Sequence, residues 1–214
     1  ASVGSSVFID NRKADVSDSS GEATLSKVIP GERTVLVSKE GHWPWTKKVN
    51  LESGGEVELH PFSVPSSPNA RVLDNKDAEY QKAVSSVSSY ALPTSEKPLV
   101  SSDKTIEVFM EAGNVRARWI GSEEDRPPLF CEGPCGPIDV LRPDKSKVRD
   151  VTFFGDRNDV IIVAVTNGVF ALDLNPLGTQ NFQPMYLGTE PTLAPIDNKT
   201  LYIKDTAYYI RLEY

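Results

Sequence analysis

The cysteines are the first residues whose spacing suggests chemistry. Cys131 and Cys135 are the only two in the chain, in the run Phe-Cys-Glu-Gly-Pro-Cys-Gly. Two cysteines cannot complete a four-ligand zinc site alone, and the spacing is not the C-x-x-C of redox proteins. A fold-back at Gly133-Pro134 can bring the two Cα atoms within disulfide distance. We expect a local disulfide, with a pair of free thiols or a metal as alternatives.

Catalytic motifs are missing from the sequence. It contains no G-x-S-x-G, no H-E-x-x-H and no glycine-rich phosphate loop, and it offers no cofactor signature. His42 and His60 are the only imidazoles, and both fall at turns or strand ends. A Ser-His-Asp arrangement or a pair of glycosidase carboxylates stays possible, because their members are distant in a chain. We nevertheless expect no enzyme and no cofactor.

Trp43 and Trp45 flank Pro44 in a predicted turn. Exposed aromatic side chains at a turn can stack on a sugar or on a proline of a partner. The alternative is that one or both close the end of a β core. These two tryptophans are candidate binding residues.

Arg116 and Arg118 alternate with apolar residues, so they share one face of a predicted hairpin. Two guanidinium groups on one face could bind a carboxylate or a phosphate. They could equally pair across the strands with Glu107 or Glu111 on a solvated face. Both arginines are candidate binding residues, and cross-strand ion pairing is the alternative.

No metal site is expected. The acidic run 122–125 could hold calcium, but no segment has the D-x-[DN]-x-[DN]-G loop. Residues 156–159 come nearest to it and read better as a hairpin turn.

Composition narrows the class of protein. The 214 residues carry a net charge of −7, which argues against a nucleic-acid partner and against attachment to an anionic membrane surface. No run approaches the length of apolar residues that spans a bilayer. We expect any membrane anchor to lie upstream of Ala1.

The elements that carry these residues are predominantly strands. Residues 1–65 contain short runs bounded by turns, among them 6–10, 23–28, 33–39, 47–51 and 56–59, with 15–21 as a polar loop. Such runs without a helix predict a small antiparallel β-sandwich. Residues 66–102 predict a linker with one short helix over 76–90, whose apolar face holds Tyr80, Ala83, Val84 and Val87.

Residues 103–214 predict repeated hairpins. The runs 103–120, 158–174 and 198–214 each read as strand, turn and strand, and Asn167-Gly168 is the strongest hairpin turn in the chain. The run 148–154 and residues 184–187 would complete a four-stranded sheet around the middle hairpin. The spacing of roughly 40 to 55 residues is typical of propeller blades.

The N-terminal pattern resembles a PEGA domain. Pro30-Gly31, the alternation at Val35 and Val37, the turn at Gly41 and the return through Val49 and Leu51 carry the resemblance, with Trp43 or Trp45 as its aromatic. The namesake motif is absent, and Glu22-Ala23-Thr24-Leu25 replaces the usual Thr-Pro before the second strand. The resemblance covers about 60 residues. It implies a β-sandwich on a prokaryotic cell surface or envelope, usually as an accessory module.

The C-terminal hairpins look like blades of a β-propeller, although three are too few to close a ring. Together, these features predict a non-enzymatic bacterial surface or envelope module for contact with an unknown protein or a cell-wall glycan. A structural spacer that holds a membrane anchor away from the surface is the first alternative. A hydrolase on the C-terminal half is the second.

Overall fold

The computed structural model describes residues 2–127, 130–131, 135–143, 146–175 and 178–214. The described residues are mainly β, with four antiparallel sheets and one short α-helix, which confirms the predicted mainly β class. The four sheets are called I to IV below. Among the described residues, no helix has the length and apolar character needed to cross a membrane.

Sheet I contains the N-terminal strands in the order β2-β1-β3-β4. These strands are β1 (Ser6–Ile9), β2 (Arg12–Val16), β3 (Gly31–Ser38) and β4 (Trp45–Leu51). Strand β4 alternates strictly, because Trp45, Lys47 and Val49 are buried while the residues between them are at least partly exposed. One face of the sheet therefore points inward, as the period of two requires.

The strand predictions for the N-terminal region are partly wrong. Residues 23–28 and 56–59 were expected as strands and lie outside every strand. Both runs are largely exposed, so they have no neighbouring strand to supply ladder hydrogen bonds. The polar loop expected from residue 15 instead begins after Val16, because Arg12–Val16 pairs with β1 as a charged edge strand.

Sheets II and III follow the predicted hairpins. Sheet II has the order β6-β7-β8-β9, and sheet III has the order β10-β11-β12-β13. Their strands are β6 (Leu99–Val100), β7 (Ile106–Glu111), β8 (Asn114–Trp119), β9 (Ile138–Leu141), β10 (Val148–Phe153), β11 (Val160–Val165), β12 (Gly168–Asp173) and β13 (Phe182–Leu187). A 3-10 turn, η1 (Glu123–Asp125), precedes β9. The four strands predicted around the middle hairpin are confirmed in sheet III.

Sheet IV is assembled from two distant parts of the chain. The strands β14 (Thr192–Asp197), β15 (Thr200–Asp205) and β16 (Tyr208–Glu213) come from the C-terminus, and β5 (Asn69–Val72) pairs antiparallel with β16. The segment 66–102 therefore contributes strands to two sheets, β5 to sheet IV and β6 to sheet II, besides its helix.

Helix α1 (Tyr80–Ser89) packs on the outer face of sheet IV. Its buried residues Ala83 and Val87 are on the predicted apolar face. The helix begins four residues later than expected. The preceding residues are held in a turn instead, where the Asp77 carboxylate accepts from the Asp74 N–H at 2.9 Å.

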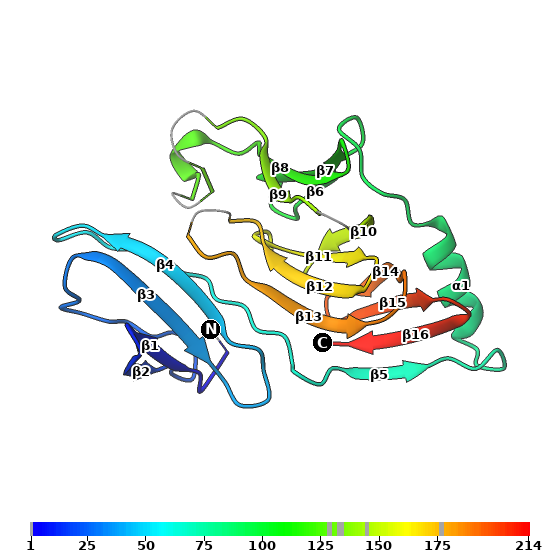
Figure 1. The fold of residues 1–214 in the computed structure, drawn as a ribbon, viewed down its shortest axis with the longest axis horizontal. Helices are drawn as coiled ribbons and strands as arrows, with labels where there is room; N and C mark the ends of the chain where they lie inside the picture. Colours follow the sequence, from blue (N-terminus) through cyan, green and yellow to red (C-terminus); the bar gives the residue numbers. More distant parts are fainter. Residues whose placement is uncertain (1, 128–129, 132–134, 144–145, 176–177) are drawn as a thin grey trace.

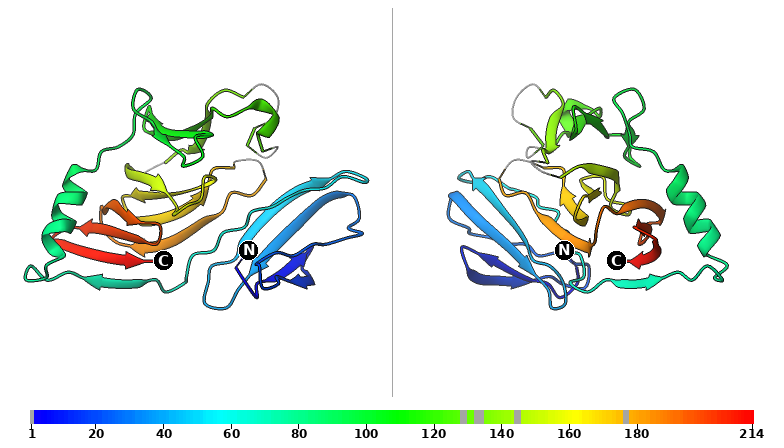
Figure 2. Two further views of the ribbon diagram at one scale, coloured as in Figure 1. Left: turned by 180° about the vertical axis from the view of Figure 1, so that it is seen from behind. Right: turned by 45° about the vertical axis from the view of Figure 1, so that its right-hand side comes forward.

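Sheets II, III and IV stack face to face, as both Figure 1 and Figure 2 show. One cluster of buried side chains joins sheets II and III, and a second joins sheets III and IV. Strands β11 and β12 are buried on both faces, which explains their nearly continuous apolar sequence. Trp45, Phe62 and Val64 enter the second cluster, so the N-terminal region packs against the stack through a shared core.

Candidate functional site

The two tryptophans have different environments. Trp45 is 3% exposed in the core shared by sheets III and IV, whereas Trp43 is 38% exposed. Two backbone hydrogen bonds fix the segment around Trp43. The Trp43 N–H donates to the Val64 carbonyl at 2.9 Å, and the Ser66 N–H donates to the Gly41 carbonyl at 2.9 Å. The structure thus assigns a core role to Trp45 and leaves Trp43 at the surface.

Arg116 and Arg118 are paired across the strands of sheet II. Arg118 Nε donates to the Glu107 carboxylate at 2.9 Å, and Arg116 pairs with Glu111 and lies 3.5 Å from Asp139. The Arg118 guanidinium also lies 5.6 Å from the centre of the buried Phe109 ring. Protein carboxylates occupy the donors that an anion would need, so this face is the solvated ion-paired face that the sequence offered as the alternative.

Cys131 and Cys135 form a disulfide with a Cα–Cα distance of 6.0 Å. The expected fold-back at Gly133-Pro134 lies outside the described residues. Arg126 holds one side of the loop, since its guanidinium donates to the Cys131 carbonyl at 2.8 Å. The loop contributes Phe130 to the core between sheets II and III.

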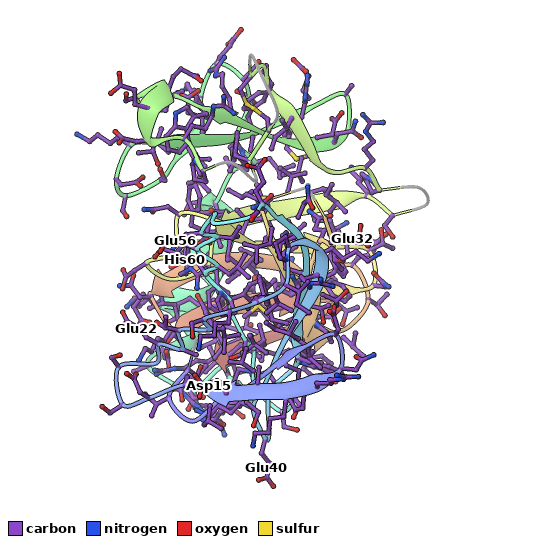
Figure 3. All side chains as sticks on the ribbon, turned by 90° about the vertical axis from the view of Figure 1, so that its left-hand side faces the viewer. Asp15, Glu22, Glu32, Glu40, Glu56 and His60 are labelled. Atoms are coloured by element: carbon purple, nitrogen blue, oxygen red, sulfur yellow. A yellow bond between two sulfur atoms is a disulfide. The ribbon has the colours of Figure 1, made fainter. Side chains whose placement is uncertain are left out.

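His60 is exposed, His42 is partly buried, and neither belongs to the buried core. His42 Nδ1 lies 3.0 Å from the Glu40 carbonyl oxygen, and His60 Nε2 lies 3.6 Å from the Glu58 carboxylate. The exposed surface of the N-terminal region also carries Asp15, Glu22, Glu32, Glu40 and Glu56, which Figure 3 labels together with His60. The same region also exposes Arg12, Lys13, Lys27 and Lys48, so its surface carries charges of both signs.

Two surface hollows could hold a ligand by their size. The first, about 400 Å³, lies between the β7–β8 turn and the start of β10 and is lined by Leu92, Met110, Asn114, Ser146, Lys147 and Val148, among others. The second, about 380 Å³, lies between sheet I and the segment before β13, and its lining includes Glu32, Lys48, Asn50 and Thr179. Neither brings a histidine beside a carboxylate in its described lining.

A buried polar cluster joins sheet I to sheet III, and the sequence did not predict it. Lys47 Nζ lies 3.2 Å from Asp173 Oδ2, with side chains only 2% and 7% exposed. Asn181 Nδ2 donates to the same carboxylate at 3.0 Å, and Lys47 also donates to the Asn175 carbonyl at 3.0 Å. Burial raises the pKa of Asp173, and the nearby Lys47 ammonium partly offsets this rise.

One feature of the sequence could have indicated this buried cluster. Lys47 occupies an inward position of an alternating strand, between Trp45 and Val49. A lysine at such a position must find a buried partner, because an unpaired buried charge is strongly unfavourable. The partner itself, Asp173 on β12, is too distant in sequence to be identified by spacing.

Asn181 and Gln183 extend the same contact. The Asn181 side chain accepts from the Thr46 N–H at 2.7 Å and donates to the Thr46 carbonyl at 2.9 Å. The Gln183 side chain accepts from the Val64 N–H at 2.8 Å. These amides satisfy backbone groups at the outer edge of β4 and in the segment that follows it, which fixes sheet I against β13.

Comparison with known proteins adds no family to these observations: no protein-family model, curated protein or solved structure matches the chain.

Proposed function

We propose that this protein is a non-enzymatic surface module of a bacterial cell envelope, which contacts a protein or a cell-wall glycan through Trp43. The observation that carries the proposal is an indole 38% exposed on a segment whose backbone is fixed on both sides. A rigid aromatic side chain binds with little loss of conformational entropy, and its flat face suits a sugar ring or a proline.

The disulfide supports an extracytoplasmic location. Disulfides persist in oxidising compartments and are rare where thiol reductants are abundant. The resemblance of residues 1–65 to a PEGA domain points the same way, and an anchor upstream of Ala1 would tether the module. Protein purified without reductant should show no free thiol after denaturation, and two reactive thiols would count against this location.

The net charge of −7 restricts the partner, because polyanionic wall polymers and nucleic acids would be repelled by it. A neutral glycan or a neutral to basic protein surface fits better. Binding should therefore depend only weakly on salt for a glycan and more strongly for a basic protein.

The test is binding of purified protein to insoluble cell wall and to a panel of neutral wall glycans. Trp43→Ala should abolish retention and remove the fluorescence change on titration. Ile29→Ala is the matched control, because Ile29 is 72% exposed in the same region and has no assigned role. Equal retention of the two variants, or no retention of the wild-type protein by wall, glycan or envelope protein, would refute the proposal.

A rigid spacer is the second candidate, and the buried cluster around Lys47 favours it. That cluster and the shared core make sheet I and the stack a single packed body. A spacer requires no exposed binding aromatic, so it predicts that Trp43→Ala leaves all partner retention unchanged. It also predicts solution scattering that fits one fixed arrangement of the two regions.

A further inference from the structure

Lys47, Asp173 and Asn181 come from three separate segments and meet in a site closed to solvent. Asp173 Oδ2 lies 3.2 Å from Lys47 Nζ and 3.0 Å from Asn181 Nδ2, so one carboxylate oxygen bridges an amine and a primary amide. All three residues are less than 9% exposed. An amine and an amide that share one carboxylate oxygen are the reactants of an amide exchange, and the carboxylate can act as its proton carrier.

The Asn181 amide is held in one orientation by hydrogen bonds to Thr46. Its Oδ1 accepts from the Thr46 N–H at 2.7 Å, and its Nδ2 donates to the Thr46 carbonyl at 2.9 Å. The N–H at Oδ1 polarises the carbonyl and would stabilise negative charge that develops on this oxygen during attack. Thr46 immediately precedes Lys47, so the same strand positions both the amide and the amine.

Burial prepares the two ionisable groups for proton transfer. Separated charges are costly in a site without water, and a neutral amine beside a neutral acid avoids that cost. The raised pKa of Asp173, caused first by burial, is consistent with a carboxyl that can accept a proton from the ammonium. The resulting neutral amine is the nucleophilic form of lysine.

We propose that Lys47 and Asn181 join through an autocatalytic isopeptide bond, with Asp173 as the proton carrier. Lys47 Nζ attacks Cγ of Asn181, the new Nζ–Cγ bond forms, and the Cγ–Nδ2 bond breaks. Two protons leave Nζ and pass through Asp173 to the departing nitrogen, which leaves as ammonium. Asp173 returns to its carboxylate, and no oxidant or further reactant is required.

The bond would join β4 covalently to the segment that leads into β13. It would lock sheet I onto sheet III independently of the packing between them. Denaturation would then leave a closed loop that spans most of the chain, which restricts the unfolded state as a long-range disulfide does, although no thiol reductant could open it.

The wild-type protein gives the primary test. Its intact mass after denaturation should be lower than that of the disulfide-bonded chain by one molecule of ammonia. A succinimide at Asn167-Gly168 would cause the same loss, so a tryptic map must decide. The expected product is the peptide 40–48, uncleaved after Lys47, joined to the peptide 158–199. An intact mass equal to that of the unmodified chain, or a loss confined to Asn167, overturns the proposal.

Variants assign the reacting groups. Asn181→Ala and Lys47→Met should both restore the full mass expected for their sequences. Asn175→Ala should retain the cross-link, because Lys47 donates to the Asn175 backbone carbonyl, which the substitution keeps. Lys48→Arg should also retain it, since Lys48 lies outside the cluster and is 54% exposed. Asp173→Asn should leave the chain uncross-linked, and a cross-link that persists in it would remove the assigned proton carrier and with it the mechanism.

Discussion

The buried carboxyl of Asp150 should make the stability of the fold depend on pH, by an amount that can be calculated. This residue of β10 is 6% exposed, and its carboxylate accepts from the Leu193 N–H of β14 at 2.8 Å. Burial raises its pKa to about 6 from an ordinary 3.8, against the lowering effects of the Leu193 N–H and of Arg149. Tyr90 is the other titratable group close to it, and its hydroxyl donates to the Val151 carbonyl.

The direction in which stability changes with pH follows from the protons bound by the folded and unfolded states. Between pH 4 and pH 6 the folded protein holds the Asp150 proton more tightly than the unfolded chain, so stability falls as the pH rises. At about 1.4 kcal/mol for each pH unit, a rise from 3.8 to about 6 corresponds to about 3 kcal/mol. This part of the stability is present below pH 4 and is lost above pH 6.

The perturbation is Asp150→Asn, which keeps an oxygen acceptor for Leu193 and removes the titration. Denaturant unfolding of the wild type and the variant should be compared from pH 4 to pH 8. The variant should gain up to about 3 kcal/mol relative to the wild type over this range. Asp197→Asn is the matched control: hydrogen bonding lowers the pKa of this exposed carboxyl, so its titration lies below the assay range and its stability difference from the wild type should stay nearly constant from pH 4 to pH 8. A constant stability difference between wild type and Asp150→Asn across the range would refute the reasoning.

Three further perturbations test the packing. Trp45→Ala should cost roughly 3–5 kcal/mol in denaturant unfolding, because it empties a core position, and a loss below 1 kcal/mol would contradict the burial. Gly178→Ala should destabilise by more than Gly41→Ala: both glycines have positive φ, but only at Gly178 would a Cβ lie 2.5 Å from the Lys48 carbonyl oxygen. Reduction of the Cys131–Cys135 disulfide should lower the stability by about 2 kcal/mol, because the loop that it closes is short, and a much larger loss would show that it also holds distant packing.

The sequence predicted the elements that depend on local patterns. The hairpins of residues 103–214 carry turn residues between alternating or continuous apolar runs, and the structure pairs them as expected. The helix face through Ala83 and Val87 was likewise visible as a period of 3.6. In these segments, the local pattern and the tertiary environment favour the same structure.

The pairing of strands that are distant in the chain could not be predicted from the sequence. Strand β5 is four residues long and fully exposed in its pattern, so nothing local distinguishes it from the linker around it. Its partner β16 lies at the other end of the chain. The roles of Asp173 and Asn181 were equally unpredictable. In the sequence their polar side chains are typical of loops, and only the position of β4 beside them shows that they are buried partners.

Other groups of the same chain cover both ends of the stack of three sheets. An exposed apolar sheet face would require another layer to cover it. At one end, α1 buries the outer face of sheet IV through Ala83 and Val87.

At the other end, the outer face of sheet II carries the ion pairs of Arg116 and Arg118, which cover Phe109 with polar groups. A further sheet packed there would have to remove those charges from water, which costs more than the pairing returns. Sheet IV receives its fourth strand from β5 of the same chain. Both ends of the stack are therefore finished within one chain, as terminal repeats with polar outer faces finish a repeat array, and no ring closure is needed.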